Sequence, residues 1–255
     1  MLNFLYLTGD LHGSAQRLLD FKPARPHETG LIVLGDAGAN YYLNQKDDRF
    51  KTQLNNLGYK IYLLRGNHEA RPEDIPDINK IYDEDLKGEV FEQPQYPNIR
   101  YLLDGGTYTF KDKSILTIGG AYSVDKFYRL AQGWQWFHNE QLNEQERESI
   151  FNTIKDKHFD FVLTHTCPTQ FQPTDLFLRT IDQGLVDNTT EKWLTEIEKN
   201  IDYNYWLFGH YHKDRIIDRK VIMLMHCIID IEAITQYENY QILPFGMELS
   251  KQFYY

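Results

Sequence analysis

Short apolar runs that end abruptly in glycine and polar residues recur along the chain. They occupy residues 4–7, 31–34, 61–64, 161–163 and 205–208. Unbroken apolar runs of this length are typical of strands buried on both faces of a sheet. Each run is followed within a few residues by Asp, Asn or His. Open α/β sheets bind their ligands at the carboxyl ends of such strands, so these polar residues are candidates for chemistry.

Segments with a helical period separate the apolar runs. They predict helices at residues 14–21, 47–57, 143–157 and 190–200. Gly58 follows the second of these where a glycine commonly ends a helix. Residues 143–146 (Asn-Glu-Gln-Glu) resemble a capping box at the start of the third. Because strands and helices alternate at the start of the chain, we expect a parallel sheet with right-handed crossovers.

The rest of the chain has weaker patterns. Alternating stretches predict strands at 99–103, 107–110 and 114–118, joined as hairpins through Gly105-Gly106 and residues 111–113, and they indicate a second layer of sheet. A hairpin over 216–224 and a further strand at 227–231 follow. The acidic, proline-containing segment 71–97 is predicted to be mostly loop, and the aromatic segment 127–139, which has no clean periodicity, is predicted to be a loop near the site. We expect the aromatic tail, 237–255, to pack on the body of the protein.

Composition narrows the function classes. A chain of 255 residues with 42% hydrophobic residues suits one α/β domain over residues 1–255. The net charge of −10 argues against an extended nucleic-acid surface. Two cysteines, Cys167 and Cys227, form no disulfide framework and favour a reducing cytoplasm. We expect no membrane partner, because neither a signal peptide nor an apolar run of roughly 18–20 residues is visible.

Eight polar residues follow the predicted strands: Asp10, His12, Asp36, Asn67, His68, His165, His210 and His212. Their oxygen and nitrogen ligands, without thiolates, suit divalent ions such as Mn²⁺, Fe or Zn²⁺. One carboxylate can bridge two such ions. Any one of these histidines alone is more simply interpreted as a surface or structural residue; five in the same context favour a metal site. The other four, His27, His138, His158 and His226, lack this context.

The order of these motifs resembles the calcineurin-like metallophosphoesterase superfamily. The matching blocks are Gly-Asp-x-His-Gly at 9–13, Gly-Asp at 35–36, Gly-Asn-His-Glu at 66–69, His165, and Gly-His-x-His at 209–212. The resemblance implies a four-layer α/β/β/α sandwich with a dinuclear metal centre. It implies that Asp10, His12 and His212 hold one ion. It also implies that Asn67, His165 and His210 hold the other, that Asp36 bridges them, and that His68 is the catalytic acid.

The chain departs from the phosphoprotein-phosphatase branch of that superfamily, which residues 64–69 otherwise resemble. After Asp36 it has Ala37-Gly38-Ala39-Asn40, without the second aspartate and the arginine of that branch. No ligand position is lost. Candidates for the missing phosphate contact are Arg65, Lys126 and Arg129; for Arg65 a structural salt bridge is the favoured alternative. Tyr128, Trp134 and Trp136 could stack on a nucleobase, although core packing is the favoured interpretation.

These observations predict a metal-dependent phosphoesterase with a phosphate-ester substrate. A hydroxide shared by two divalent ions would attack phosphorus, and His68 would protonate the leaving oxygen. Mn²⁺ is the favoured metal, with Fe, Zn²⁺, Ni²⁺ and Mg²⁺ as alternatives. A monoesterase or phosphatase is favoured over a phosphodiesterase or nuclease that acts on nucleotides or nucleic-acid ends. The alternative from another class is a catalytically idle binding module. The sequence leaves the oligomeric state open.

Overall fold

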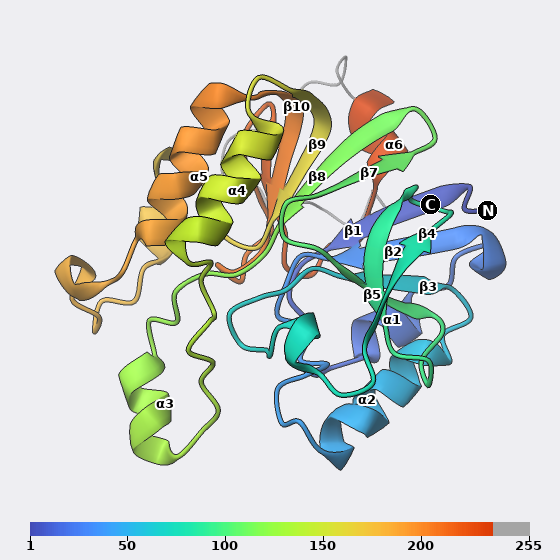
Figure 1. Cartoon of the computed structure of the whole chain (residues 1–255), viewed down its shortest axis with the longest axis horizontal. Helices are drawn as coiled ribbons and strands as arrows, with labels where there is room; N and C mark the ends of the chain where they lie inside the picture. The colour runs from blue at the N-terminus through green and yellow to red at the C-terminus, as the bar shows by residue number, and fades with distance from the viewer. Residues whose placement is uncertain (237–255) are drawn as a thin grey trace.

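The computed structural model describes residues 1–236, which form two β-sheets packed face to face (Figure 1). The first sheet has seven strands in the order β13 (Ile229–Asp230), β1 (Phe4–Thr8), β2 (Thr29–Val33), β3 (Lys60–Leu63), β6 (Ile99–Leu102), β5 (Gly88–Glu92) and β4 (Asn79–Asp83). The second has six, in the order β11 (Arg215–Asp218), β12 (Val221–Met223), β10 (Asp202–Phe208), β9 (His158–Thr164), β8 (Lys113–Ile118) and β7 (Gly106–Phe110).

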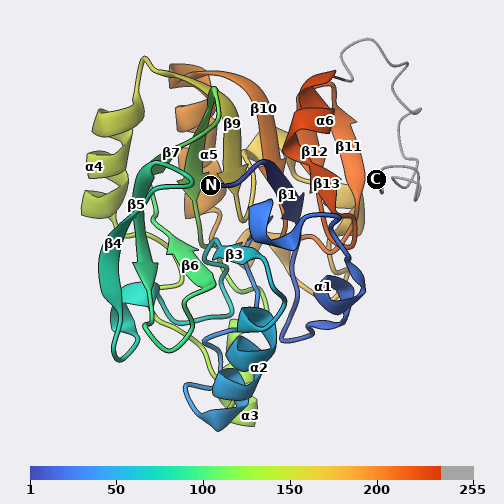
Figure 2. The same ribbon diagram turned by 90° about the vertical axis from the view of Figure 1, so that its right-hand side faces the viewer.

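Helices cover the outer face of each sheet (Figure 2). The first sheet packs against α1 (Gln16–Asp20) and α2 (Gln45–Asn55), and the second against α4 (Glu144–Ile154) and α5 (Thr189–Asn200). The predicted α/β class and four-layer α/β/β/α sandwich are therefore confirmed. The short helix α3 (Lys126–Gln132) projects away from both sheets (Figure 1). Helix α6 (Ile231–Gln236), beside β1, ends the described chain.

Three apolar cores hold the layers together, one between the sheets and one under each helical layer. Successive side chains of a strand point to opposite faces, so a strand between two cores needs apolar residues at every position. In β2, Ile32 enters the core between the sheets, whereas Leu31 and Val33 enter the core under α2. In β9, Phe161 faces the other sheet and Val162 faces the outer helices. Burial on both faces thus explains the unbroken apolar runs.

The parallel pairing places the functional loops at one end of the molecule. Strands β1, β2 and β3 are parallel neighbours, as predicted, and so are β8, β9 and β10. Parallel strands present their carboxyl ends at the same edge of a sheet, and the polar motifs all follow those ends. The predicted hairpins β7–β8 and β11–β12 and the capping box of α4 at Asn143 are also confirmed.

Two predictions from local patterns were wrong, and one was incomplete. Segment 71–97 is mostly loop, as predicted, but it also contains the antiparallel pair β4–β5, whose exposed edge strand tolerates charged residues. Segment 127–139 begins within α3, which buries no residue and so shows no apolar period. The turn at Gly105-Gly106 does not close a hairpin, because β6 and β7 belong to different sheets.

The end of the described chain also differs from the prediction. Of residues 227–231, only Ile229–Asp230 forms a strand, and α6 begins at the next residue. Two predictions concern residues 237–255, which lie outside the described residues. They are that this tail packs on the body of the protein and that a single domain extends through residue 255. None of the helices within residues 1–236 combines the length and apolar character that crossing a bilayer requires.

Candidate metal centre

The predicted ligands lie on five loops that leave the carboxyl ends of strands from both sheets. Asp10 and His12 follow β1, Asp36 follows β2, Asn67 and His68 follow β3, His165 follows β9, and His210 and His212 follow β10. Asp10, Asp36 and His165 are 0–1% exposed. The strands thus bring residues up to about two hundred positions apart into one buried cluster.

Four of these residues have left-handed backbone. His12, Asp36, His210 and His212 have φ angles of 47°, 46°, 68° and 55°. Non-glycine residues rarely adopt this conformation, and it costs of order 1–3 kcal/mol each unless the surroundings hold it in place. Four of the nine such residues within 1–236 are in this cluster. Backbone strain concentrated at one place is typical of a functional site.

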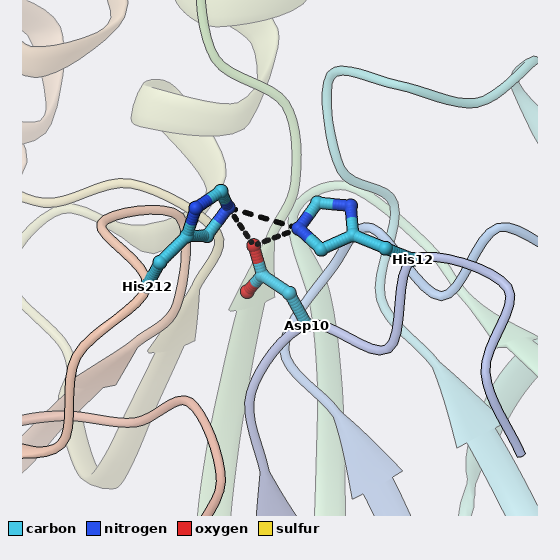
Figure 3. Close-up of side chains that lie close together, drawn as sticks. All are labelled: Asp10, His12 and His212. Atoms are coloured by element: carbon cyan, nitrogen blue, oxygen red, sulfur yellow. Dashed lines mark hydrogen bonds and ion pairs between the residues drawn. The ribbon is translucent and has the colours of Figure 1, made fainter. Parts of the chain in front are cut away.

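Asp10, His12 and His212 form the first group of donor atoms (Figure 3). The Oδ2 atom of Asp10 lies 3.6 Å from Nε2 of His12 and 3.4 Å from Nε2 of His212, and the two Nε2 atoms are 2.9 Å apart. Asp10 Oδ2 is buried and has no hydrogen-bond partner within the described chain. A buried carboxylate oxygen without a partner is costly, and a cation between these three atoms would satisfy it.

Asp36, Asn67 and His165 form a second group. Nε2 of His165 lies 3.7 Å from Oδ2 of Asp36 and 2.9 Å from Oδ1 of Asn67. Asp10 also lies within 4.8 Å of Asp36 and His165, so it adjoins both groups. The assignment of Asp36 as the bridging residue therefore stays a prediction.

In the second group, the hydrogen bonds of a neutral His165 and of Asn67 direct a lone pair on each residue toward the other. Nδ1 of His165 lies 2.8 Å from the carbonyl oxygen of Leu34, which can only accept, so a neutral His165 has its lone pair on Nε2. Nδ2 of Asn67 donates to Oγ of Ser123 at 2.8 Å, so the carbonyl oxygen Oδ1 of Asn67 faces that Nε2. Two acceptors 2.9 Å apart repel each other, and a divalent cation that binds both would remove the conflict. The donor set therefore fits a metal.

His210 adjoins this second group through its ring and its backbone. Its ring centroid lies 4.9 Å from that of His165, and its backbone N–H donates to Oδ1 of Asp10 at 3.0 Å. Burial, reinforced by His165, lowers the pKa of His210 to about 3. The imidazole is therefore neutral at physiological pH and keeps a lone pair for a metal.

Two glycines let the ligand loops approach each other closely. A Cβ atom at Gly66 would overlap Oδ1 of Asp36, and one at Gly35 would overlap the ring of His165. Gly35 also has a φ of 92°, which a residue with a side chain rarely adopts. The glycines before Asp36 and Asn67 are thus required by packing around the candidate centre.

A comparison with protein families agrees with this geometry. Residues 5–214 match the family model for calcineurin-like phosphoesterases. The chain belongs to the calcineurin-like phosphoesterase family. No curated protein matches it. Members of this family are metal-dependent phosphoesterase hydrolases, which makes the present chain a phosphoesterase.

In this phosphoesterase, His68 lies beside the second group of donor atoms. Its side chain is 20% exposed, so it can reach a substrate, and its Nε2 lies 3.7 Å from Oδ2 of Asp36. Nδ2 of Asn67 and Nη2 of Arg129 each lie 3.3 Å from the same nitrogen. The carboxylate that faces His68 is therefore Asp36 itself, since this chain lacks the second aspartate of the related phosphatase branch.

The three candidates for phosphate contact have different surroundings. Arg65 is buried, and its guanidinium donates to the Asp104 carboxylate and the Glu140 carbonyl, which favours the structural salt bridge. The Nζ atom of Lys126 lies 4.0 Å from the centroid of the Trp136 ring. Only Arg129, of the three, contacts a residue of the predicted site.

Most of the supporting residues had no signal in the sequence. Ser123 donates to Oε2 of Glu140 at 2.6 Å and accepts from the amide of Asn67, which fixes that amide, although the three residues are far apart in the chain.

The aromatic candidates Tyr128 and Trp134 are more than half exposed and contact each other edge to face, so the prediction that they pack in the core was wrong for both. Cys167 is fully buried, and burial raises the pKa of its thiol, as is usual for an unreactive core cysteine.

A cavity of about 270 Å³ opens beside the candidate centre. Asp36, Asn67, His68, His210 and His212 line one end of it. The rest of the lining comes mainly from residues 172–191, which include two short 3₁₀ turns, Thr174–Leu176 and Gln183–Leu185, and the start of α5. A substrate held at the donor groups would extend into this cavity.

Proposed function

We propose that the protein hydrolyses phosphate monoesters at a pair of divalent ions, with Mn²⁺ favoured and His68 as general acid. Asp10, His12 and His212 would hold one ion, and Asn67, His165 and His210 the other, with Asp36 between them. The observation that supports this most strongly is the 2.9 Å contact between Oδ1 of Asn67 and Nε2 of His165, which a neutral His165 would make with one lone pair facing another. A divalent cation that binds both atoms would make this contact favourable.

The bound ions would supply Lewis acidity, which lowers the pKa of water toward neutrality and neutralises the phosphoryl oxygens. The protein side chains supply positioning and proton transfer. His68 borders the cavity, so its imidazole can hold a proton beside the leaving oxygen. Asp36 Oδ1 accepts from the backbone N–H of His68 at 2.8 Å, which fixes the loop that presents the imidazole.

Arg129 is the residue we propose for the phosphate contact. Its Nη2 atom is 3.3 Å from His68 Nε2, so a phosphoryl group next to His68 would also lie beside the guanidinium. Guanidinium groups bind phosphate through parallel hydrogen bonds. Arg129 thus compensates for the arginine that is missing after Asp36. The catalytically idle alternative is disfavoured, because the chain retains every predicted ligand.

The test is metal analysis combined with turnover of p-nitrophenyl phosphate and its bis ester. We expect about two ions per chain and monoester hydrolysis that depends on Mn²⁺ or a similar ion. Asp36→Asn and His210→Ala should lower turnover by on the order of a thousandfold, because several kcal/mol of charge stabilisation is lost. The exposed His27→Ala serves as the control and should keep full activity.

Two outcomes would overturn the proposal. A wild-type protein that binds no divalent ion would exclude the metal centre. Equal turnover by Asp36→Asn and wild type would show that the hydrolysis comes from a contaminant or another site. Faster hydrolysis of the bis ester than of the monoester would instead favour the phosphodiesterase alternative.

A further inference from the structure

The cavity beside the candidate centre has an end that the proposed chemistry does not use. His68 lines the cavity and would protonate the leaving oxygen as its bond to phosphorus breaks, so the group bonded to that oxygen would extend into the rest of the cavity. The inference below rests on the proposed function, because it assigns the part of the substrate that leaves. It concerns the chemistry of that part alone.

The rest of the cavity has an apolar wall. Its lining includes Val124, Leu176, Phe177, Leu178, Ile181 and Val186. The ring of Phe177 stacks on that of Tyr211 with centroids 6.3 Å apart and an angle of 20° between planes. Tyr211 lies between the ligands His210 and His212 in sequence, so the apolar wall begins directly beside the donor groups. Such a surface favours an apolar or aromatic group.

The charges in the lining are all negative or belong to histidines. The lining residues, all within the described chain, include no lysine or arginine. Asp125 has a cation partner, because its Oδ2 accepts from Nε of Arg129 at 2.8 Å. Glu191 makes no ion pair with a lysine or arginine within residues 1–236. A second anionic group on the substrate would therefore face an uncompensated carboxylate in a partly desolvated cavity.

Glu191 also has an unused hydrogen-bond acceptor. The residue is 4% exposed, and its Oε1 accepts from Oγ1 of Thr166 at 2.9 Å. Its Oε2 is buried without a hydrogen-bond partner. Thr166 in turn contacts the hydroxyl of Tyr211 at 3.0 Å, which ties the carboxylate to the loops of His165 and His210. A rotation of the carboxylate that turns this oxygen toward the cavity would let an N–H or O–H of a bound molecule satisfy it.

We propose that this cavity binds the leaving alcohol of the substrate, and that the alcohol is an apolar or aromatic group with an N–H or O–H donor for Glu191 and no negative charge. Leu176 and Phe177 contact its apolar part, and Glu191 accepts its hydrogen bond. The substrate class is thus a small monoester with a single phosphate. Nucleoside di- and triphosphates, nucleic-acid strands and sugar bisphosphates fall outside it.

The experiment uses three aryl phosphates whose leaving groups carry different charges. They are tyramine phosphate, with an ammonium donor, phenyl phosphate, and 4-carboxyphenyl phosphate. At pH 7.5 the wild-type protein should hydrolyse the carboxylate ester with a kcat/KM at least about tenfold below that of phenyl phosphate. The kcat/KM for tyramine phosphate should equal or exceed that for phenyl phosphate.

Two variants test whether Glu191 and Leu176 cause this substrate preference. Glu191→Gln keeps the size of the side chain but removes its charge, and it should narrow the range of kcat/KM across the series by at least about threefold. Leu176→Ala should raise the KM of phenyl phosphate and leave the order of the series unchanged. The matched control is Leu185→Ala, in the same segment but 79% exposed and outside the cavity lining, which should match wild type.

The outcomes separate the inference from the proposed function. Metal-dependent hydrolysis of all three esters at similar kcat/KM would overturn the inference and leave the function standing. If the differences in kcat/KM among the three esters are the same in Glu191→Gln as in wild type, Glu191 is not their cause, and the inference is also overturned. No hydrolysis of any ester with any divalent ion would overturn the proposed function, and the inference with it.

Discussion

Arg129 Nη2 lies 3.3 Å from Nε2 of His68, although the two residues are 61 positions apart. The guanidinium is held from two other directions, because Nε donates to Asp125 at 2.8 Å and Nη1 donates to the Tyr41 hydroxyl at 3.1 Å. Helix α3 buries none of its residues in a core. Its best-anchored side chain is thus the one that points back to the site.

Arg129→Ala should raise KM and lower kcat/KM for p-nitrophenyl phosphate by roughly 10–100-fold. A charge-assisted hydrogen bond to phosphate contributes about 1.5–3 kcal/mol, and tenfold in rate corresponds to about 1.4 kcal/mol. Tyr41→Phe, which removes only one support of the guanidinium, should stay within about threefold of wild type. Steady-state kinetics on the metal-loaded variants measures both effects. Unchanged KM in Arg129→Ala would show that this arginine does not touch the phosphate.

Ser123→Ala should weaken binding of the second ion without unfolding the protein. The Ser123 hydroxyl accepts from Asn67 Nδ2 and donates to Glu140, so its loss frees the amide to rotate. Residues that orient a metal ligand typically contribute 10–100-fold in affinity. Titration of the metal-free protein with Mn²⁺, followed by calorimetry, should show one site weakened and one unchanged. Ser149→Ala, on the exposed face of α4, is the control. Equal weakening of both sites would contradict a specific role.

The stability of the metal-free protein should depend on pH through Glu191. Burial raises the pKa of this carboxyl from 4.5 to about 6, so the folded state holds a proton that the unfolded chain has released. The stabilisation by that proton is complete below pH 4.5 and is lost as the pH rises through 6. Relative to Glu191→Gln, the wild type should therefore lose about 2 kcal/mol of unfolding free energy between pH 4 and pH 7. Urea unfolding of both proteins in a chelator measures this, and a pH-independent difference would refute it.

Cys167 should resist thiol reagents until the protein unfolds. It is fully buried, and burial raises the pKa of the thiol well above its usual value, so thiolate is scarce. Cys227 is only partly buried and should react in the native state. Alkylation followed by mass mapping of the two peptides distinguishes them. Rapid labelling of Cys167 in the native protein would indicate that the loop after β9 opens readily.

The sequence predicts best where a strand has a core on both faces. Unbroken apolar runs such as 31–34 are recognisable without knowledge of the partners, since every side chain is buried. The edge strand β4 and the helix α3 were missed because neither has a continuous buried face. The glycines at 105 and 106 were misread for a different reason: a local turn signal does not reveal whether the next strand joins the same sheet.

The candidate ligands were recognisable because chemistry and position coincide in the sequence. Each is a metal-binding residue type placed directly after a strand, and the order of motifs matched a family. Ser123, Glu140 and Glu191 could not be identified in this way, because their roles depend on contacts with residues that are distant in sequence. The left-handed backbone at His12 and Asp36 is likewise imposed by the packed loops, against the local preference of those residues.

The left-handed backbone of four predicted ligands has a consequence for the engineering of this protein. Asparagine tolerates φ angles near 50° better than histidine, so a His12→Asn change would relieve part of the strain. A library screened for heat resistance in a chelating buffer would therefore enrich for such changes. The most heat-resistant variants from that screen would be ones that no longer bind metal. Thermal selection should therefore be run with the metal present.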